Sequence, residues 1–167
     1  KAKSLTQGAA DYVIATPMYM GITNVIDSLI IVKQFVFDEN IVTMAELIDA
    51  LKNDWAGYED LHTLILNKGD FFGNDTERSN YVAQRLYRSL YEFLKDKTNL
   101  FGYHWLIGDL TGYNVHFKIF GEMLGATPDG RLAFTPIAGG VGPVSGRDVA
   151  GPTATANSVA KLDHGIA

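Results

Sequence analysis

The sequence lacks cysteine altogether, and this absence removes several classes of function at once. A chain without thiols can form no disulfide, no thiolate zinc site and no cysteine nucleophile of its own. Long apolar runs are also missing, since none reaches the roughly 18 residues that a membrane helix needs. The N-terminus has no charged stretch followed by an apolar one, as a signal peptide would. We therefore predict a cytoplasmic chain with no membrane partner.

Positive charge is scarce, because 14 Lys and Arg stand against 19 Asp and Glu, for a formal net charge of -5. The basic residues are scattered, so there is no basic stripe for a nucleic acid or an anionic surface. The four His residues lack the spacing of metal ligands. Ser145 and Ser158 do not lie in a Gly-x-Ser-x-Gly motif. We predict no metal, no nucleic-acid partner and, within this chain, no catalytic residue.

What the sequence does contain is a series of helical patterns, in which apolar residues recur at intervals of three and four. The first runs from Thr23, a candidate N-cap, to about Phe37 and is apolar around most of its circumference, which predicts burial between layers. Thr43 and Glu46 form a capping box for the next helix, which Gly57 ends. Further helices are predicted over a short stretch before Gly69, over a long stretch from a cap at Asp75 to about Lys97, with Phe93 on its inward stripe, and over 112–123.

The remaining stretches carry weaker patterns. Residues 12–15 suit a brief extended segment, 98–111 a loop, 134–145 a strand or an extended finger, and 154–162 a helix or a strand. Both ends resemble cut chain, because neither has a capped terminal element. We expect residues 1–167 to be a single interior segment of a larger domain.

The pattern changes at a turn, Gly125-Ala-Thr-Pro-Asp-Gly-Arg131, which is followed by the glycine-rich run 137–148. Pro128 fixes its own φ and Gly130 is free to take a positive φ, so a sharp reversal of the chain is predicted. A phosphate cradle fits poorly, because no Gly-Lys-Ser/Thr follows and Pro143 lacks the N–H donor that such a loop needs. A nucleotide-binding module is therefore the weakest alternative.

Several blocks resemble, in order and spacing, the late part of glycyl radical enzymes of the pyruvate formate-lyase and diol-dehydratase type. They are Gly8–Tyr12, Gly21–Leu29 with Lys33 and Val36-Phe37, Gly73–Asp75, Gly125–Arg131, Gly142–Asp148, Gly151–Ala154 and Asn157–His164. Ala9 and Val13 depart from the family's Gly-Gly-Ala-x-Tyr-Asn. The resemblance covers essentially the whole chain. It implies an α/β fold, in which this mostly helical segment is part of a ten-stranded α/β barrel.

The resemblance also implies a chemistry. A radical SAM activating enzyme places a radical on a glycine, and that radical generates a thiyl radical on a cysteine inside the barrel, where burial excludes water and oxygen. The expected reaction is an anaerobic lyase, dehydratase or decarboxylase reaction. This chain contains neither the cysteine nor the glycyl radical loop, so we expect it to bind no cofactor and to be inactive alone. The implied partners are a small-molecule substrate, the activating enzyme, the rest of the enzyme chain and a second copy in a homodimer.

The residues that the resemblance places at the substrate lie in one extended segment that lines the barrel pocket. They are Val141, Pro143, Val144 and Ser145, with Val144 as an apolar wall and Ser145 as a hydroxyl group. Tyr12 and Met18–Met20 are second candidates. The residues of Gly125–Arg131 and Arg147-Asp148 are expected to hold loops together by Arg–Asp pairing rather than to catalyse.

A different class of function stays open on the residues alone. It is a stand-alone helical protein-interaction domain with the glycine-rich run as its ligand loop. Such a domain would be monodisperse and would melt cooperatively, whereas an isolated segment would expose the apolar surface of the 23–37 helix.

Overall fold

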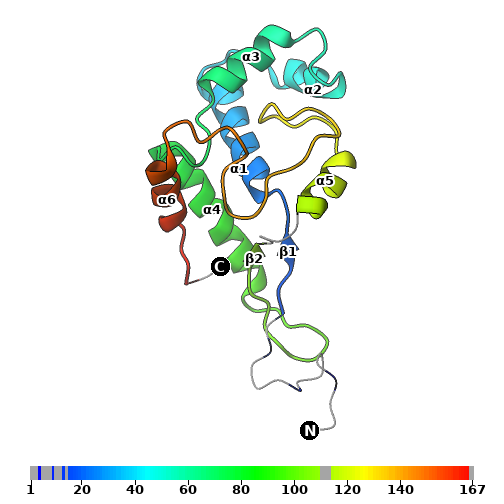
Figure 1. The fold of residues 1–167 in the computed structure, drawn as a ribbon, viewed down its shortest axis with the longest axis vertical. Helices are drawn as coiled ribbons and strands as arrows, with labels where there is room; N and C mark the ends of the chain where they lie inside the picture. The colour runs from blue at the N-terminus through cyan, green and yellow to red at the C-terminus, as the bar shows by residue number, and fades with distance from the viewer. Residues whose placement is uncertain (1–3, 5–8, 10–12, 14, 110–113, 166–167) are drawn as a thin grey trace.

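The computed structural model describes residues 4, 9, 13, 15–109 and 114–165 (Figure 1). Helices dominate its regular structure, as predicted, and the described residues do not form a barrel among themselves. Within these ranges, no helix is both long and apolar enough to cross a membrane. The elements in chain order are β1 (Met18–Tyr19), α1 (Ile22–Ile31), the π-helix η2 (Val32–Asp38), α2 (Met44–Lys52), α3 (Glu59–Lys68), α4 (Glu77–Leu94), β2 (Gly108–Asp109), α5 (Asn114–Glu122) and α6 (Pro152–Ala160).

The helix predicted over 23–37 is confirmed, and it lies at the centre of the fold (Figure 1). It begins at Ile22, after Gly21 with φ 69°, and continues directly into η2. The predicted cap at Thr23 is wrong, because Thr23 lies inside the helix and its hydroxyl donates to the carbonyl of Gly142 at 2.8 Å. This hydroxyl therefore bonds a distant loop and does not cap its own helix.

Two apolar cores meet along α1 and η2. These two elements form one continuous helix, here called the rod. Because the rod contributes side chains to both cores, it fixes the position of α4 relative to α2 and α3. The first core consists of Ile22, Ile26, Ile30, Phe72, Ala83, Tyr87, Leu94, Ile107 and Leu162. The second consists of Ile31, Phe35, Val42, Leu47, Ala50, Trp55, Ile65 and Phe71.

The rod is not covered all round by the described residues. Val25, Leu29 and Phe37 keep 48%, 47% and 65% of their surfaces exposed. An apolar groove between the rod and α4 is lined by these last two side chains together with Tyr81, Val82 and Leu86. The sequence predicts burial for this face, and within the described chain that burial is incomplete.

The capping box at the start of α2 is confirmed. The Glu46 N–H donates to Thr43 Oγ1 at 3.2 Å, and the Thr43 N–H donates to Glu46 Oε2 at 2.9 Å. The predicted end at Gly57 is wrong, since α2 ends at Lys52 and Trp55 already has φ 66°. Trp55 is buried and stacks on His62 of α3, with ring centroids 5.0 Å apart. The helix therefore ends before two non-glycine residues with positive φ, Asp54 and Trp55, rather than at Gly57.

The long helix α4 is present, but its predicted cap is wrong. Thr76 caps it, accepting from the Ser79 N–H at 3.2 Å, and Asp75 lies outside the helix with φ 56°. The predicted inward stripe is wrong at Phe93, which keeps 63% of its surface exposed. Leu94 is buried as the pattern predicts, and Ala83 and Tyr87 extend the buried apolar face.

A small parallel sheet joins β1 to β2, with Met18 opposite Gly108. Ala15 and Trp105 form an isolated parallel bridge beside it. The stretch 98–111, predicted to be a loop, therefore carries a short strand. Of the extended segment predicted at 12–15, residues 12 and 14 lie outside the described residues.

Residues 134–145, all of them described, form no strand, so that alternative is wrong. Their path is irregular, and Gly140 has φ 70°. Side chains of α1 bond backbone groups in this stretch, at Ala138 and Gly142, that a neighbouring strand would otherwise have to satisfy. Of the two alternatives for 154–162, the helix is right, and α6 begins at Pro152, which suits a first turn because proline lacks an N–H.

Replacing Thr43 with Ala should lower the free energy of unfolding by about 1 kcal/mol, because the Glu46 N–H loses its acceptor. The matched control is Thr63→Ala, since Thr63 is exposed in the interior of α3, where alanine is the better helix former. Urea unfolding followed by circular dichroism measures both. Equal stability of the two variants would contradict a stabilising capping box.

Candidate functional site

The candidate site is built on a buried polar face of α1. Thr23, Asn24 and Asp27 occupy positions i, i+1 and i+4, which lie on one side of a helix, and their exposures are 0%, 5% and 0%. Polar groups buried in this way need hydrogen-bond partners. Each of the three finds its partners on loops remote in the sequence, so α1 gathers these loops.

Asn24 joins the 125–131 turn to the glycine-rich run. Its amide group donates to Asp129 Oδ2 at 2.8 Å, and its side-chain oxygen accepts from the Ala138 N–H at 2.7 Å. The predicted reversal is confirmed, since Gly130 has φ 83° and the Thr127 N–H donates to the Arg131 carbonyl at 3.0 Å. The fully buried Asp129 is thus an internal acceptor at the centre of the turn.

Arg147 pairs with the same carboxylate. A guanidinium nitrogen lies 3.6 Å from Asp129 Oδ2, and both side chains are largely withdrawn from water. The guanidinium also lies over the Phe71 ring, 4.3 Å from its centroid, where the face of the ring attracts a cation. The predicted Arg–Asp pairing is confirmed, and it closes the glycine-rich run onto the turn.

The segment predicted to contact substrate begins next to the α1 polar face. Val141 packs against the core between α1 and α4, and the next carbonyl, that of Gly142, is the one that Thr23 bonds. Pro143 lies against Gly73, so closely that a Cβ on Gly73 would be 2.7 Å from the Pro143 Cβ. The first half of the segment is therefore held from two sides.

Its second half turns outward. Val144 is partly buried, and its carbonyl accepts from the Arg147 N–H at 3.0 Å, whereas Ser145 is exposed. The structure thus brings Val141, Pro143, Val144 and Ser145 onto one restrained loop. They differ in exposure, since Ser145 is exposed and the other three are partly buried.

The second candidates for substrate contact, Tyr12 and Met18–Met20, do not all lie at one place. Tyr12 lies outside the described residues, and Met18 is 63% exposed in β1. Met20 lines a cavity of about 330 Å³ between α1 and the 125–131 turn, together with Leu124, Pro128 and Ile137, and Met18 is not part of that lining. Met20 thus adjoins the start of the glycine-rich run at Ile137.

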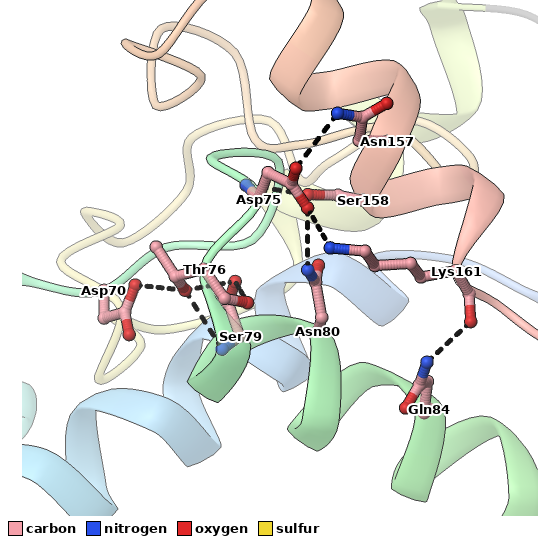
Figure 2. Close-up of polar contacts among 9 residues, drawn as sticks. All are labelled: Asp70, Asp75, Thr76, Ser79, Asn80, Gln84, Asn157, Ser158 and Lys161. Atoms are coloured by element: carbon pink, nitrogen blue, oxygen red, sulfur yellow. Dashed lines mark hydrogen bonds and ion pairs between the residues drawn. The ribbon is translucent and has the colours of Figure 1, made fainter.

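The turn before α4 is tied to α6 through Asp75 (Figure 2). Lys161 Nζ, Asn157 Nδ2 and Asn80 Nδ2 donate to its carboxylate at 2.5, 3.0 and 3.0 Å. The Asp75 N–H donates to Ser158 Oγ at 2.9 Å. The bond from Lys161, followed by those from the two amides, lowers the pKa of Asp75, so its charged form is favoured and α6 stays docked.

Asp27 is electrostatically the most perturbed member of the α1 polar face. The Phe72 N–H donates to its Oδ1 at 2.9 Å, while Oδ2 has no hydrogen-bond partner in the described chain. Desolvation raises the pKa of Asp27 to about 7 against the lowering effect of the Phe72 bond, with Asp129 and Asp70 raising it further and Arg147 lowering it. Asp27 therefore stays neutral in weakly acidic solution.

Sequence patterns alone miss this polar face. They predict a cap at Thr23 and burial between layers for the helix that contains Asp27. A usable signal is present all the same, because Thr23, Asn24 and Asp27 lie at i, i+1 and i+4, on one side of a helix that is apolar around most of its circumference. A stripe too narrow for a solvated face indicates buried hydrogen bonds.

Residues 1–117 match a protein-family model described as Pyruvate formate lyase-like, which is well over half of the chain. The chain belongs to the pyruvate formate lyase-like family of glycyl radical enzymes. It is 34% identical over 164 residues to trans-4-hydroxy-L-proline dehydratase from Clostridioides difficile, covering 98% of this chain and 20% of that protein. It is 38% identical over 139 residues to isethionate sulfite-lyase from Bilophila wadsworthia, covering 81% of this chain and 16% of that protein.

The structural likeness within the family is equally extensive. The glycerol-bound B12-independent glycerol dehydratase from Clostridium butyricum matches with a TM-score of 0.87 and 41% identity, over 98% of this chain and 20% of that chain. The chain therefore spans about a fifth of the length of these glycyl radical enzymes. The resemblance carried by the sequence blocks is confirmed, and it is favoured over an unrelated helical interaction domain.

The stability of the folded chain should fall as the pH rises from about 4 to about 7. In this window folded Asp27 keeps its proton, whereas in the unfolded chain, where the ordinary pKa is 3.8, it is already ionised. Above pH 7 both states are ionised and the decline ends, after a loss of at most about 4 kcal/mol. The variant Asp27→Asn has no carboxyl group to ionise and so does not show this loss. The melting temperature of the variant minus that of the wild type should therefore be larger at pH 8 than at pH 5.

The matched control for this measurement is Asp96→Asn, which alters an exposed carboxylate outside the site. Differential scanning calorimetry from pH 5 to pH 9 compares the three chains. If the melting temperatures of Asp27→Asn and the wild type differ by the same amount at every pH, the raised pKa is contradicted.

Proposed function

We propose that this chain is one segment of a glycyl radical enzyme that dehydrates a small hydroxylated substrate under anaerobic conditions. The observation that carries the proposal is the match to glycerol dehydratase over 98% of this chain, at 41% identity and with the same backbone path. The match to a hydroxyproline dehydratase supports the same reaction class. In both relatives the aligned part is about a fifth of the protein, so the activity is assigned to the enzyme of which this chain forms a part.

In this proposal, residues 1–167 are a single segment of a ten-stranded α/β barrel. The parallel pairing of β1 and β2 supports the assignment, because the helical connection from α1 to α4 that links these two strands is the crossover that parallel strands require. The partly uncovered face of α1 and η2 would be covered by the rest of the barrel. The proposal includes a cytoplasmic homodimer.

The radical chemistry in this proposal belongs to residues outside the chain. The sequence has no cysteine, so another part of the enzyme supplies the thiyl-forming residue, and a radical SAM activating enzyme installs the glycyl radical. When present, that radical supplies hydrogen abstraction. The residues described here form part of the substrate-binding surface and exclude water from it.

Val141, Pro143, Val144 and Ser145 are proposed to form one wall of the substrate pocket. The restraints on their loop support this role, because a wall that holds a substrate in reactive geometry must itself be rigid. Val141 anchors the loop in the core, and Pro143 is fixed against Gly73. Val144 would then present an apolar surface, and the exposed Ser145 a hydroxyl group.

Cleavage of a carbon–sulfur bond is the second candidate reaction. It is favoured by the 38% identity to isethionate sulfite-lyase, although that alignment covers 81% of this chain rather than 98%. Both candidates use a small substrate with a polar group next to the reacting carbon. They differ in the group that leaves, which is water in one case and sulfite in the other.

The test uses the full-length enzyme, activated without oxygen by a radical SAM activating enzyme. Electron paramagnetic resonance quantifies the glycyl radical, and turnover is followed with glycerol, trans-4-hydroxy-L-proline and isethionate. Loss of water from either hydroxylated substrate supports the first candidate, and release of sulfite supports the second. Absence of a glycyl radical after activation would overturn both.

Within that enzyme, Val144→Phe should reduce kcat/KM by about tenfold or more, because a larger side chain narrows the proposed pocket, while the glycyl radical signal stays at the wild-type level. Val149→Phe is the matched control, since Val149 is 87% exposed in the same stretch of chain. Equal kcat/KM values for the two variants would remove Val144 from the pocket wall.

A further inference from the structure

One buried side chain of α1 bonds the turn that precedes α4, and Thr155 of α6 bonds the same turn at the carbonyl of Gly73. Asp27 is completely buried, and its Oδ1 accepts the backbone N–H of Phe72 at 2.9 Å. Phe72 itself is also fully buried in the core between α1 and α4. Because the backbone N–H is removed from water, its bond to Asp27 determines where this part of the chain lies.

Residues 71–74, here called the Phe71–Asn74 turn, in turn support the segment proposed to contact substrate. The ring of Phe71 lies under the guanidinium of Arg147, at 4.3 Å from its centroid. Gly73 leaves no room for a Cβ beside Pro143, which shows how closely these two residues approach.

Asn74 adds two further bonds from the same turn. Its amide group donates to the carbonyl of Arg147 at 2.8 Å, and its side-chain oxygen accepts from the Ala150 N–H at 2.9 Å. Contacts from three of the four residues of the turn thus converge on 143–150. A shift of the turn would therefore be passed directly to Pro143 and to the loop around Val144.

We propose that Asp27 is a positioning residue for substrate binding, which holds the Phe71–Asn74 turn through the Phe72 N–H and thereby sets the place of Pro143 and Val144. This inference rests on the proposed function, because it requires 141–145 to be part of the substrate pocket. Asp27 itself does not contact the substrate. Its effect on catalysis passes through the turn.

The role requires an acceptor at Asp27 rather than a negative charge. Asn at this position keeps an oxygen for the Phe72 N–H, whereas Ala leaves that N–H buried without its acceptor. The two variants therefore separate positioning by the hydrogen bond from any contribution of ionisation. Leu47→Ala supplies a control for lost stability alone, because Leu47 is buried in the core formed with α2 and α3.

The experiment measures kcat, KM and the glycyl radical content of the activated full-length enzyme, with glycerol as the substrate if the wild type accepts it and otherwise with the substrate that it turns over. For Asp27→Ala we expect KM to rise by about tenfold, with radical content at the wild-type level. Asp27→Asn should have a KM within about twofold of the wild type, as should Leu47→Ala. A wild-type KM for Asp27→Ala, or an equal rise for Asp27→Asn, would overturn the inference.

A second pair of variants keeps the inference testable if Asp27→Ala does not fold. Gly73→Ala places a Cβ against Pro143 at a residue with φ 98°, so it should raise KM in the same way. Gly57→Ala introduces the same kind of backbone strain, at φ 82°, with no atom within 4 Å of the added Cβ. Equal KM values for these two variants would overturn the inference, whereas a wild type that forms radical but acts on none of the tested substrates would overturn the proposed function.

Discussion

The arrangement of the loops depends on one side chain, the amide of Asn24, which donates to Asp129 and accepts from Ala138 inside the protein. A buried amide that loses a partner costs roughly 1–3 kcal/mol, so the burial of this face of α1 forces the two loops to come to it. Thr23 and Asp27 are buried in the same way, and they bond the carbonyl of Gly142 and the Phe72 N–H of the Phe71–Asn74 turn. The apolar side of α1 holds the helices together, while its polar side determines where the irregular chain runs.

This division follows from the composition of the glycine-rich run. Gly139, Gly140 and Gly142 have no side chains with which to anchor themselves in a core, so the run cannot be held by apolar packing alone. Its backbone groups still need partners, and polar side chains of α1 supply them at Ala138 and Gly142. Because the loop is held through its backbone, the side chains of Val144 and Ser145 are not needed to anchor it. They are therefore available to contact a ligand.

The sequence predicts those features that depend on neighbouring residues, and it misses those that depend on distant ones. The helix over α1 and η2, the Thr43–Glu46 capping box and the reversal at Gly130 were all predictable, because periodicity and local backbone preferences determine them. The caps at Thr23 and Asp75 were predicted wrongly for the opposite reason. Thr23 bonds a carbonyl 119 positions away, and the carboxylate of Asp75 bonds α6. The residues next to Thr23 and Asp75 in the sequence do not indicate these partners. The site was predictable only as far as the family resemblance reached, since spacing alone gives no reason to connect Val144 with Phe71.

The charged groups at the centre of the site limit how many of them can be ionised at once. Asp27, Asp129 and Arg147 would carry a net negative charge in a buried space if both acids were ionised, and burial makes that state costly. The cost is avoided when one acid keeps its proton. Burial raises the pKa of Asp27 to about 7, because it outweighs the one backbone N–H bond to this carboxyl group, and Oδ2 has no hydrogen-bond partner in the described chain. Asn24 bonds Asp129 and Arg147 lies beside it, while the bond that holds the Phe71–Asn74 turn needs only a neutral acceptor. One helix face thus holds both loops, one through the amide of Asn24 and the other through the acceptor oxygen of Asp27.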